Sequence, residues 1–319
     1  GDHRDLHSFP TRRSSDLKPG FIREYYDYEF GGHYSTTRVT RGDGDYALMQ
    51  NAWNAQWSHN RYRAYYPWTI GGAVWSMYDY NRGCCDNICY SGLADLFRLP
   101  KFGLLYFRTQ MKEGTFTPAG PMTYEVFINS HWLEGSSDTL QVYGNVDEVK
   151  LQLNGRVIAR QYPDDKPSTS EYVSRPDGGN AENIDFPPFT FFNVNWERGE
   201  LKAIGYKDGK AVAEHVVRTP GAVEAMDITY FESGVSASCR DLLIVYVNLK
   251  DLQGTGCFGE NNREVKLEVL QGGELRGPAT IKAEAGVASF LVATTDSPML
   301  VLKAVSGNLE TMRKLKLKK

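Results

Sequence analysis

The hydrophobic pattern divides the chain into a first part that alternates strand and helix patterns and a longer remainder that predicts strands. Phe21 and Ile22 lead a short apolar segment that ends at Glu24, which indicates a strand. From Asp43 onward, large apolar residues recur at three- and four-residue steps, and this spacing predicts one face of a helix. The residues of that face are Tyr46, Met49, Trp53 and Trp57.

A second strand and a second helix follow in the same order. The nearly continuous apolar run around Val74, in TIGGAVWSMYD, is typical of a strand that is buried on both sides in a parallel sheet. A helix is expected after Pro100, because proline is tolerated in a first helical turn. Strand, helix, strand and helix in this order predict part of an α/β fold over residues 18–114.

Strand patterns dominate after a Gly-, Pro- and Thr-rich linker at residues 114–122. Asn154-Gly155 and Asp208-Gly209 lie between alternating apolar residues, which is a strong hairpin signal. We expect two immunoglobulin-like β-sandwich domains, at 119–220 and 221–319, with a boundary near Pro220. The polar stretch 163–183 is too poor in apolar residues for a core and is expected to form a long mobile loop.

Composition excludes several classes of partner. No run of 18 apolar residues is present, so no membrane-spanning segment is predicted. The net charge of −3 gives no basic footprint for nucleic acid, and no cofactor motif is found. Cys84, Cys85 and Cys89 lack a second pair or a nearby His at zinc spacing, so no metal site is predicted, and loop thiols or a local disulfide both fit.

The first 17 residues, GDHRDLHSFPTRRSSDL, differ in character from the rest. They are polar, contain Pro10 and show neither a helical nor a strand period. Read back into codons, they correspond to DNA that resembles a short-read sequencing adapter. We therefore expect residues 1–17 to be non-native and Lys18 to be the first residue of the protein itself.

Candidate chemistry lies at the ends of the two predicted parallel strands. Catalytic groups of parallel α/β barrels lie at the carboxyl ends of strands, where Glu24 and Trp75 are expected. A carboxylate can act as a nucleophile or an acid, and an aromatic face can stack on the apolar face of a sugar ring. The pair therefore suggests a carbohydrate substrate.

Several dispersed motifs together resemble the C-terminal part of a glycoside hydrolase family 2 enzyme of the β-galactosidase type. They run in the family's order over residues 18–221: REYYDYEFGG, RGDGD, GGAVWSMYDYNRG, SGLADLFRLPKF, VYGNVDEVKLQLNGRVIAR, PPFTF and LKAIGYKDGKAVAEHVVRTPG. The resemblance implies a (β/α)8 barrel followed by immunoglobulin-like domains. FIREY would then be the seventh barrel strand and GGAVWSMYDY the eighth.

The resemblance also implies roles for individual residues. Glu24 would be the retaining nucleophile and Trp75 the floor of the sugar pocket, and three loop residues would line that pocket: Asp79, Asn81 and Arg82. Glu29, in YEFGG, is the alternative nucleophile. The family has Gly where this chain has Tyr25, which leaves the turn after the strand open.

Retaining glycosidases need a second carboxyl group, and the family supplies it after the fourth barrel strand. Residues 18–114 are about 97 residues, against about 250 for a whole barrel, so we expect this chain alone to lack activity. The strand edge beside FIREY is expected to be unpaired, with uncovered apolar faces. The residues leave the compartment open, and the resemblance to the family suggests a periplasmic or secreted bacterial protein. The alternative is a non-catalytic protein whose sandwiches bind carbohydrate, through side chains such as Trp132 and Trp196.

Overall fold

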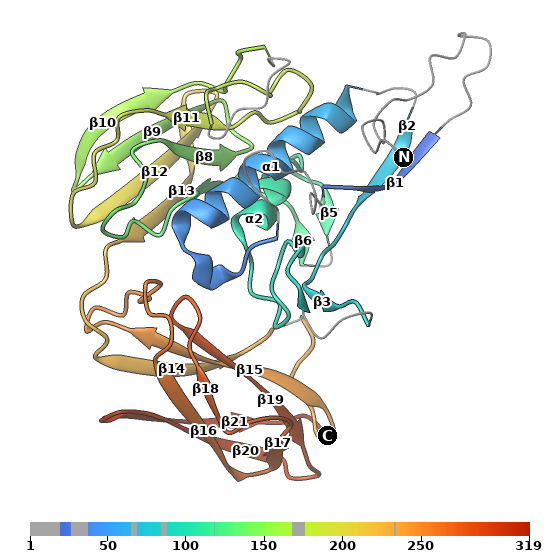
Figure 1. The fold of residues 1–319 in the computed structure, drawn as a ribbon, viewed down its shortest axis with the longest axis vertical. Helices are drawn as coiled ribbons and strands as arrows, with labels where there is room; N and C mark the ends of the chain where they lie inside the picture. The colour runs from blue at the N-terminus through green and yellow to red at the C-terminus, as the bar shows by residue number, and fades with distance from the viewer. Residues whose placement is uncertain are drawn as a thin grey trace.

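The computed structural model describes residues 20–26, 38–64, 69–83, 88–117, 119–167, 176–232 and 234–319. Two sandwich-like arrangements of antiparallel strands make up most of this part of the chain, and a smaller segment with two helices packs against both. Figure 1 shows α1 and α2 beside the first sandwich, with the second sandwich at the other end of the molecule. The mostly β architecture agrees with the predicted sandwiches.

The first part contains the predicted strand and helix elements. β1 (Gly20–Tyr25) and β2 (Thr69–Val74) pair in parallel, and α1 (Asp45–Arg63) and α2 (Phe102–Thr109) follow them in the chain as expected. Short elements complete this part: η3 (Arg41–Asp43), β3 (Tyr80–Asn81), β4 (Ile88–Cys89), β5 (Phe116–Thr117) and β6 (Gly120–Pro121). That these elements are the C-terminal part of a (β/α)8 barrel stays a prediction, because the described parallel sheet has two strands.

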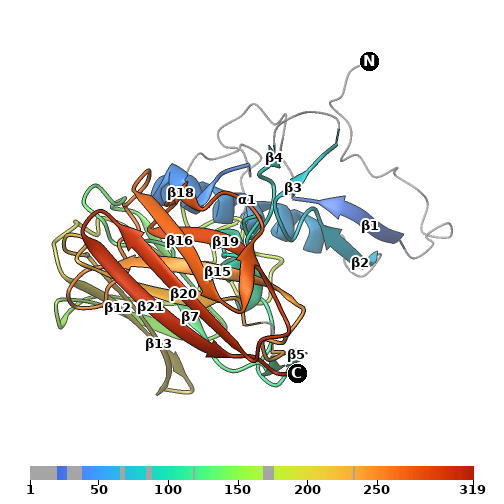
Figure 2. The same ribbon diagram turned by 90° about the horizontal axis from the view of Figure 1, so that it is seen from below.

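The expected burial of β2 on both faces is wrong. Ile70 is 72% exposed, and Phe21 on β1 is 58% exposed. Both strands lie at the edge of the molecule, away from the second sandwich, in Figures 1 and 2. In the described part of the chain, each of the two strands pairs only with the other, and Phe21 and Ile70 remain uncovered, as expected for the edge beside FIREY.

The apolar face predicted for α1 is partly wrong. Met49 and Trp53 are buried, but Tyr46 is 52% exposed. The helix instead buries several polar side chains: Asn51, Asn54, Gln56, Ser58 and Asn60. Apolar spacing could not reveal this face, because Asn51, Gln56 and Asn60 contact other segments through hydrogen bonds.

The first sandwich packs two antiparallel sheets around one apolar core. One sheet has the order β10 (Arg156–Gln161), β9 (Glu148–Leu153), β12 (Glu200–Lys207) and β13 (Lys210–Arg218), and the other has β11 (Phe189–Phe191), β8 (Leu140–Gly144) and β7 (Val126–Ile128). Both predicted hairpin turns are confirmed: Asn154-Gly155 and Asp208-Gly209 have positive φ and join antiparallel strands.

β8 is buried on both faces and joins the helices to the sandwich. Leu140 and Val142 face the sandwich core, whereas the alternate residues Gln141 and Tyr143 contact the helical part, the segment that contains α1 and α2. Gln141 donates a hydrogen bond to Gln56 of α1, and the ring of Tyr143 packs edge-on against Tyr106 of α2. The helices therefore form a third layer on this sandwich.

The prediction that residues 163–183 form a mobile loop is wrong for the described residues after 175. Residues 178–181 are buried, and Gln56 donates hydrogen bonds to the carbonyl oxygens of Gly179 and Asn180, each at 3.1 Å. The Asn183 backbone N–H donates to the Asn60 side chain at 2.9 Å. Because these partners are backbone groups, a polar segment can dock without apolar residues of its own.

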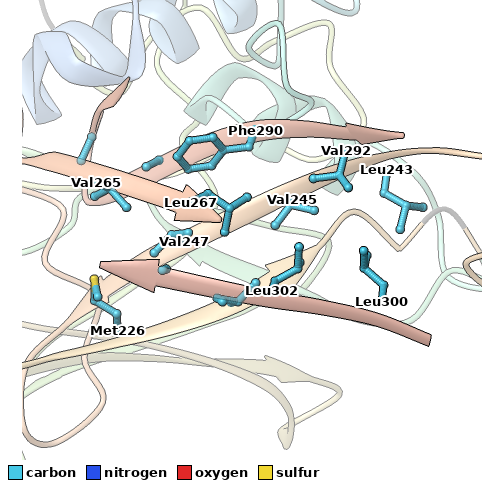
Figure 3. Packing of buried hydrophobic residues seen from close by; sticks show 14 of the residues in the cluster. Met226, Leu243, Val245, Val247, Val265, Leu267, Phe290, Val292, Leu300 and Leu302 are labelled. Atoms are coloured by element: carbon cyan, nitrogen blue, oxygen red, sulfur yellow. The ribbon is translucent and has the colours of Figure 1, made fainter. Parts of the chain in front are cut away.

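The second sandwich is built from two four-stranded sheets. Their orders are β14 (Ala225–Tyr230), β15 (Leu242–Lys250), β19 (Val287–Thr294) and β17 (Gly273–Leu275), and β18 (Thr280–Lys282), β16 (Glu264–Gln271), β20 (Met299–Ser306) and β21 (Leu309–Lys316). Figure 3 shows Val245 and Phe290 of one sheet packed with Leu267 and Leu302 of the other. The predicted limits of the domains stay a prediction.

The helical part also contacts the second sandwich. Arg41 donates to the carbonyl oxygens of Glu284 and Ala285, and Tyr246 donates to the carbonyl oxygen of Phe97 at 2.7 Å.

Among the described residues, no helix has the length and apolar character needed to cross a membrane.

Two leucines of β16 test the second core. Leu267→Ala removes a fully buried side chain and is expected to lower the free energy of unfolding by about 2–5 kcal/mol. Leu270→Ala, on the same strand but 52% exposed, is the matched control and is expected to cost less than about 0.5 kcal/mol. Urea denaturation measures both, and equal losses would contradict this core.

Candidate active site

The parallel pairing of β1 and β2 brings Glu24 and Trp75 to the same end of the small sheet. Tyr25 pairs with Val74, and the Trp75 backbone N–H donates to the Tyr25 carbonyl oxygen at 3.0 Å. Glu24 is the residue before Tyr25, and Trp75 directly follows the last residue of β2. Carboxyl ends of parallel strands are where catalytic groups of such sheets lie, so this end is the candidate active site.

Glu24 presents its carboxylate to solvent. Its side chain is 44% exposed, and the Arg23 guanidinium lies 3.5 Å from its Oε2. The chain turns directly after the strand, where Tyr26 has a φ of 91° and a fully buried side chain. Tyr25 itself remains in the strand, so the special backbone conformation lies one residue after the position where the family has Gly.

Trp75 is held from its polar edge. Its indole N–H donates to the Tyr80 hydroxyl at 2.9 Å, and the two rings meet edge to face with centroids 5.6 Å apart. The tryptophan side chain is 40% exposed, and the peptide bond to Ser76 is cis. A partly exposed indole fixed by one hydrogen bond leaves a ring surface available for stacking.

The loop after Trp75 is fastened by backbone contacts with residues 91–94. Leu93 N–H donates to the Ser76 carbonyl oxygen, and Ala94 N–H to that of Met77, each at 3.0 Å. Gly92 fits only as glycine, because a Cβ there would lie 2.2 Å from the Asp79 backbone nitrogen. This close approach fixes the course of the segment that carries Trp75.

Asp79 is enclosed rather than open to solvent. Its carboxylate accepts from the buried Lys101 ammonium at 2.7 Å and from Gly92 N–H at 2.8 Å. Burial raises the pKa of Asp79 to about 6 and lowers the pKa of Lys101, and the direct contact opposes both shifts. In this structure Asp79 is an internal ion-pair partner, and a direct contact with substrate stays a prediction.

The remaining predicted site residues are exposed on the loop or lie outside the described residues. Asn81 is exposed and accepts a hydrogen bond from Gly83 N–H at 2.8 Å, and Arg82 follows it on the exposed loop. Glu29, the alternative nucleophile, lies outside the described residues, as do Cys84, Cys85 and residues 1–17. Cys89 is buried and has a free thiol.

The site's chemical resources are therefore a solvent-facing carboxylate, an indole platform and a braced loop. Among the described ranges, no group of three or more His, Cys, Asp or Glu side chains could hold a metal ion. A carboxylate at this place can act as a nucleophile or a proton carrier without a metal ligand set.

Two residues of the site were not predicted from sequence. Tyr80 lies in the same sequence motif as Trp75, so the sequence shows that the two residues are neighbours. The hydrogen bond from the indole to the Tyr80 hydroxyl, however, depends on the turn between them. Lys101 is 22 positions from Asp79 and carried no signal, because a buried lysine cannot be distinguished from a surface one by composition.

Comparisons with known proteins agree on one family of relatives. A family model described as a domain of unknown function (DUF4982) matches residues 135–213. A β-galactosidase from Thermoanaerobacter pseudethanolicus is 31% identical over 258 residues, which are 75% of this chain and 32% of that protein. The chain thus spans about a third of that relative's length.

Solved structures share the fold. A β-glycosidase from Bacteroides vulgatus has a TM-score of 0.63 at 16% identity, covering 82% of this chain and 33% of that one. A β-glucuronidase from glycoside hydrolase family 2 also has a TM-score of 0.63, at 19% identity, covering 95% of this chain and 31% of its own. Homologues and structural neighbours that cover part of this chain are thus glycoside hydrolase family 2 proteins.

Lys101→Met tests the buried ion pair. The variant leaves the Asp79 carboxylate buried without its cation, which costs about 3–5 kcal/mol when the carboxylate is charged. Loss of Lys101 raises the pKa of Asp79 further above its usual range, so the variant's stability falls as pH rises through that pKa. Urea denaturation is expected to show a larger loss at pH 8 than at pH 5.

The double variant Asp79→Asn/Lys101→Met is the control. It removes the titrating carboxyl, so its loss relative to the unmodified chain should lack the extra penalty at pH 8. An equal loss for Lys101→Met at both pH values would show that Asp79 is not confined as described.

Proposed function

We propose that this chain is the part of a retaining family 2 β-glycosidase that carries the nucleophile, and that the enzyme acts on terminal β-galactosides. The observation that carries the proposal is the placement of Glu24 and Trp75 at one end of a parallel strand pair. The similarity to the Thermoanaerobacter β-galactosidase over 75% of the chain supports the reaction class and the sugar.

In the proposed reaction, Glu24 attacks the anomeric carbon and forms a covalent glycosyl–enzyme, while a second carboxyl group protonates the leaving oxygen. Water then attacks the same carbon, the bond between that carbon and Glu24 breaks to release the Glu24 carboxylate, and the second carboxyl group, now a carboxylate, accepts the proton of the water. The exposure of the Glu24 side chain suits this role, because a nucleophile has to reach the substrate. The second group has to lie about 5–5.5 Å from Glu24 in a retaining enzyme.

Trp75 is proposed to stack on the sugar ring. Its bond to Tyr80 fixes the plane of the indole, and the Asp79–Lys101 pair fixes the loop behind it. Asn81 and Arg82, on the exposed side of the same loop, are proposed to bind sugar hydroxyls. Asp79 is then a residue that positions the loop.

The 319-residue chain alone is proposed to be inactive. The described residues supply two strands of the parallel sheet, and the family places the acid after a fourth barrel strand. The rival function is carbohydrate binding by the sandwiches, and both aromatics considered for it contact the core of the first sandwich. Trp132 is fully buried, and Trp196 packs against the same core.

Glu24→Gln tests the nucleophile in an extended protein. In that protein, the barrel strands that precede the matched region of the Thermoanaerobacter β-galactosidase are joined to the N-terminus of this chain. The amide cannot form the glycosyl–enzyme, so hydrolysis of 4-nitrophenyl β-galactoside is expected to fall at least about 1000-fold. The thermal unfolding midpoint should stay unchanged, because the Glu24 side chain is half exposed.

Glu29→Gln is the matched control in the same extended protein. It is expected to keep near-normal turnover, whereas a dead Glu29→Gln beside an active Glu24→Gln would move the nucleophile to Glu29. The unextended chain is assayed in parallel, and turnover there that Glu24→Gln abolishes would contradict the proposed need for an acid from further barrel strands.

A further inference from the structure

A cavity of about 530 Å³ lies where the helical part and the two sandwiches meet, apart from the candidate active site. We call it the junction cavity. Its walls are mostly apolar and come from all three parts, including Leu99, Phe102, Ile128, Phe258 and Val287. The volume falls in the range of about 300–1,000 Å³ that is typical of small-molecule pockets, which are mostly apolar with a few placed polar groups.

His215 supplies one fixed polar group. Its Nδ1 accepts a hydrogen bond from the Ile128 backbone N–H at 3.1 Å, so the proton of the neutral ring is on Nε2. Burial lowers the pKa of His215, and the nearby His131 lowers it further, so the ring is neutral near pH 7. No partner for Nε2 is found in the part of the chain that the structure describes, which leaves an N–H donor at the cavity wall.

His131 supplies the second fixed polar group of the cavity wall. Its Nδ1 lies 2.6 Å from Asp45 Oδ1. Burial raises the pKa of Asp45, but the hydrogen bonds and charge of His131, together with the bond from Ser130, outweigh it and lower that pKa, so the carboxylate accepts the Nδ1 proton. The ring stacks on Phe258, with centroids 4.2 Å apart and planes 16° apart. Because Asp45 holds the Nδ1 side, the Nε2 edge of the ring is the second polar group of the wall, at a fixed position.

Three further polar side chains of the wall, those of Arg41, Arg218 and Asn248, are already engaged. Arg41 pairs with Asp95 at 3.5 Å, and Arg218 pairs with Glu200 at 2.6 Å. Asn248 donates to side chains of its own sheet. An acidic ligand would find no uncommitted cation among these groups, and a sugar would leave several hydroxyls against apolar walls, which is costly.

We propose that the junction cavity binds a small aromatic alcohol, a flat apolar ring with one hydroxyl group. The ring fits between the apolar walls, and the hydroxyl oxygen accepts from His215 Nε2–H, next to the Nε2 edge of His131. A purely apolar ligand would instead leave the His215 N–H desolvated and unpaired.

The test titrates p-cresol into the 319-residue chain labelled with ¹⁵N-histidine and follows the imidazole nitrogens by long-range ¹H–¹⁵N correlation spectra. Saturable shifts are expected at Nε2 of His215 and His131. Toluene, which has nearly the same shape without the hydroxyl, is expected to bind about fivefold or more weakly. Absence of saturable p-cresol binding at millimolar concentration overturns the proposal, as does tighter binding of galactose than of p-cresol.

Two variants locate the site. In His215→Asn the side-chain oxygen can keep the bond from Ile128 N–H while the Nε2–H is lost. The affinity for p-cresol should therefore fall about fivefold, and the affinity for toluene should stay unchanged. Leu99→Trp places a larger side chain in the cavity and should abolish binding of both probes. Unchanged p-cresol affinity in His215→Asn would show that this imidazole does not hold the hydroxyl and would overturn the proposed binding mode.

Discussion

The structure depends on polar side chains that α1 buries against its neighbours. Asn51 donates to the Tyr26 hydroxyl at the end of β1 and accepts from Gly103 N–H at the start of α2. Gln56 reaches the first sandwich and the segment around Asn180, and Asp45 holds His131. Each bond satisfies a group that would otherwise be buried without a partner, which makes the position of the helix specific. The strand pair with Glu24 and Trp75 is placed by that helix.

Local periodicity predicted much of this architecture. The alternation around Asn154-Gly155 and Asp208-Gly209 is a property of neighbouring residues, so both hairpins followed from sequence. The order of strand and helix before residue 114 likewise gave the parallel pair that brings Glu24 beside Trp75. The roles of these two residues came from the resemblance to a family and stay predictions.

Contacts between distant segments could not be predicted in the same way. Lys101 pairs with Asp79, and Gln56 binds backbone carbonyls more than 120 residues away, so neither leaves a periodic trace. The same limit explains the wrong expectation for residues 176–183, whose docking uses backbone groups rather than apolar side chains. Burial of β2 was expected from its composition, but burial depends on what covers a strand.

Hydrogen–deuterium exchange of a Gln56→Leu variant tests the role of α1 most directly. The substitution leaves the Gly179 and Asn180 carbonyl oxygens and the Gln141 amide without their partner, so amides of residues 45–63 and 176–184 should exchange faster, with those of β15 unchanged. Tyr46→Leu, on the exposed side of the same helix, should leave all of them unchanged. Exchange in Gln56→Leu equal to that of the unmodified chain would contradict the view that buried polar contacts of α1 hold the helical part in place.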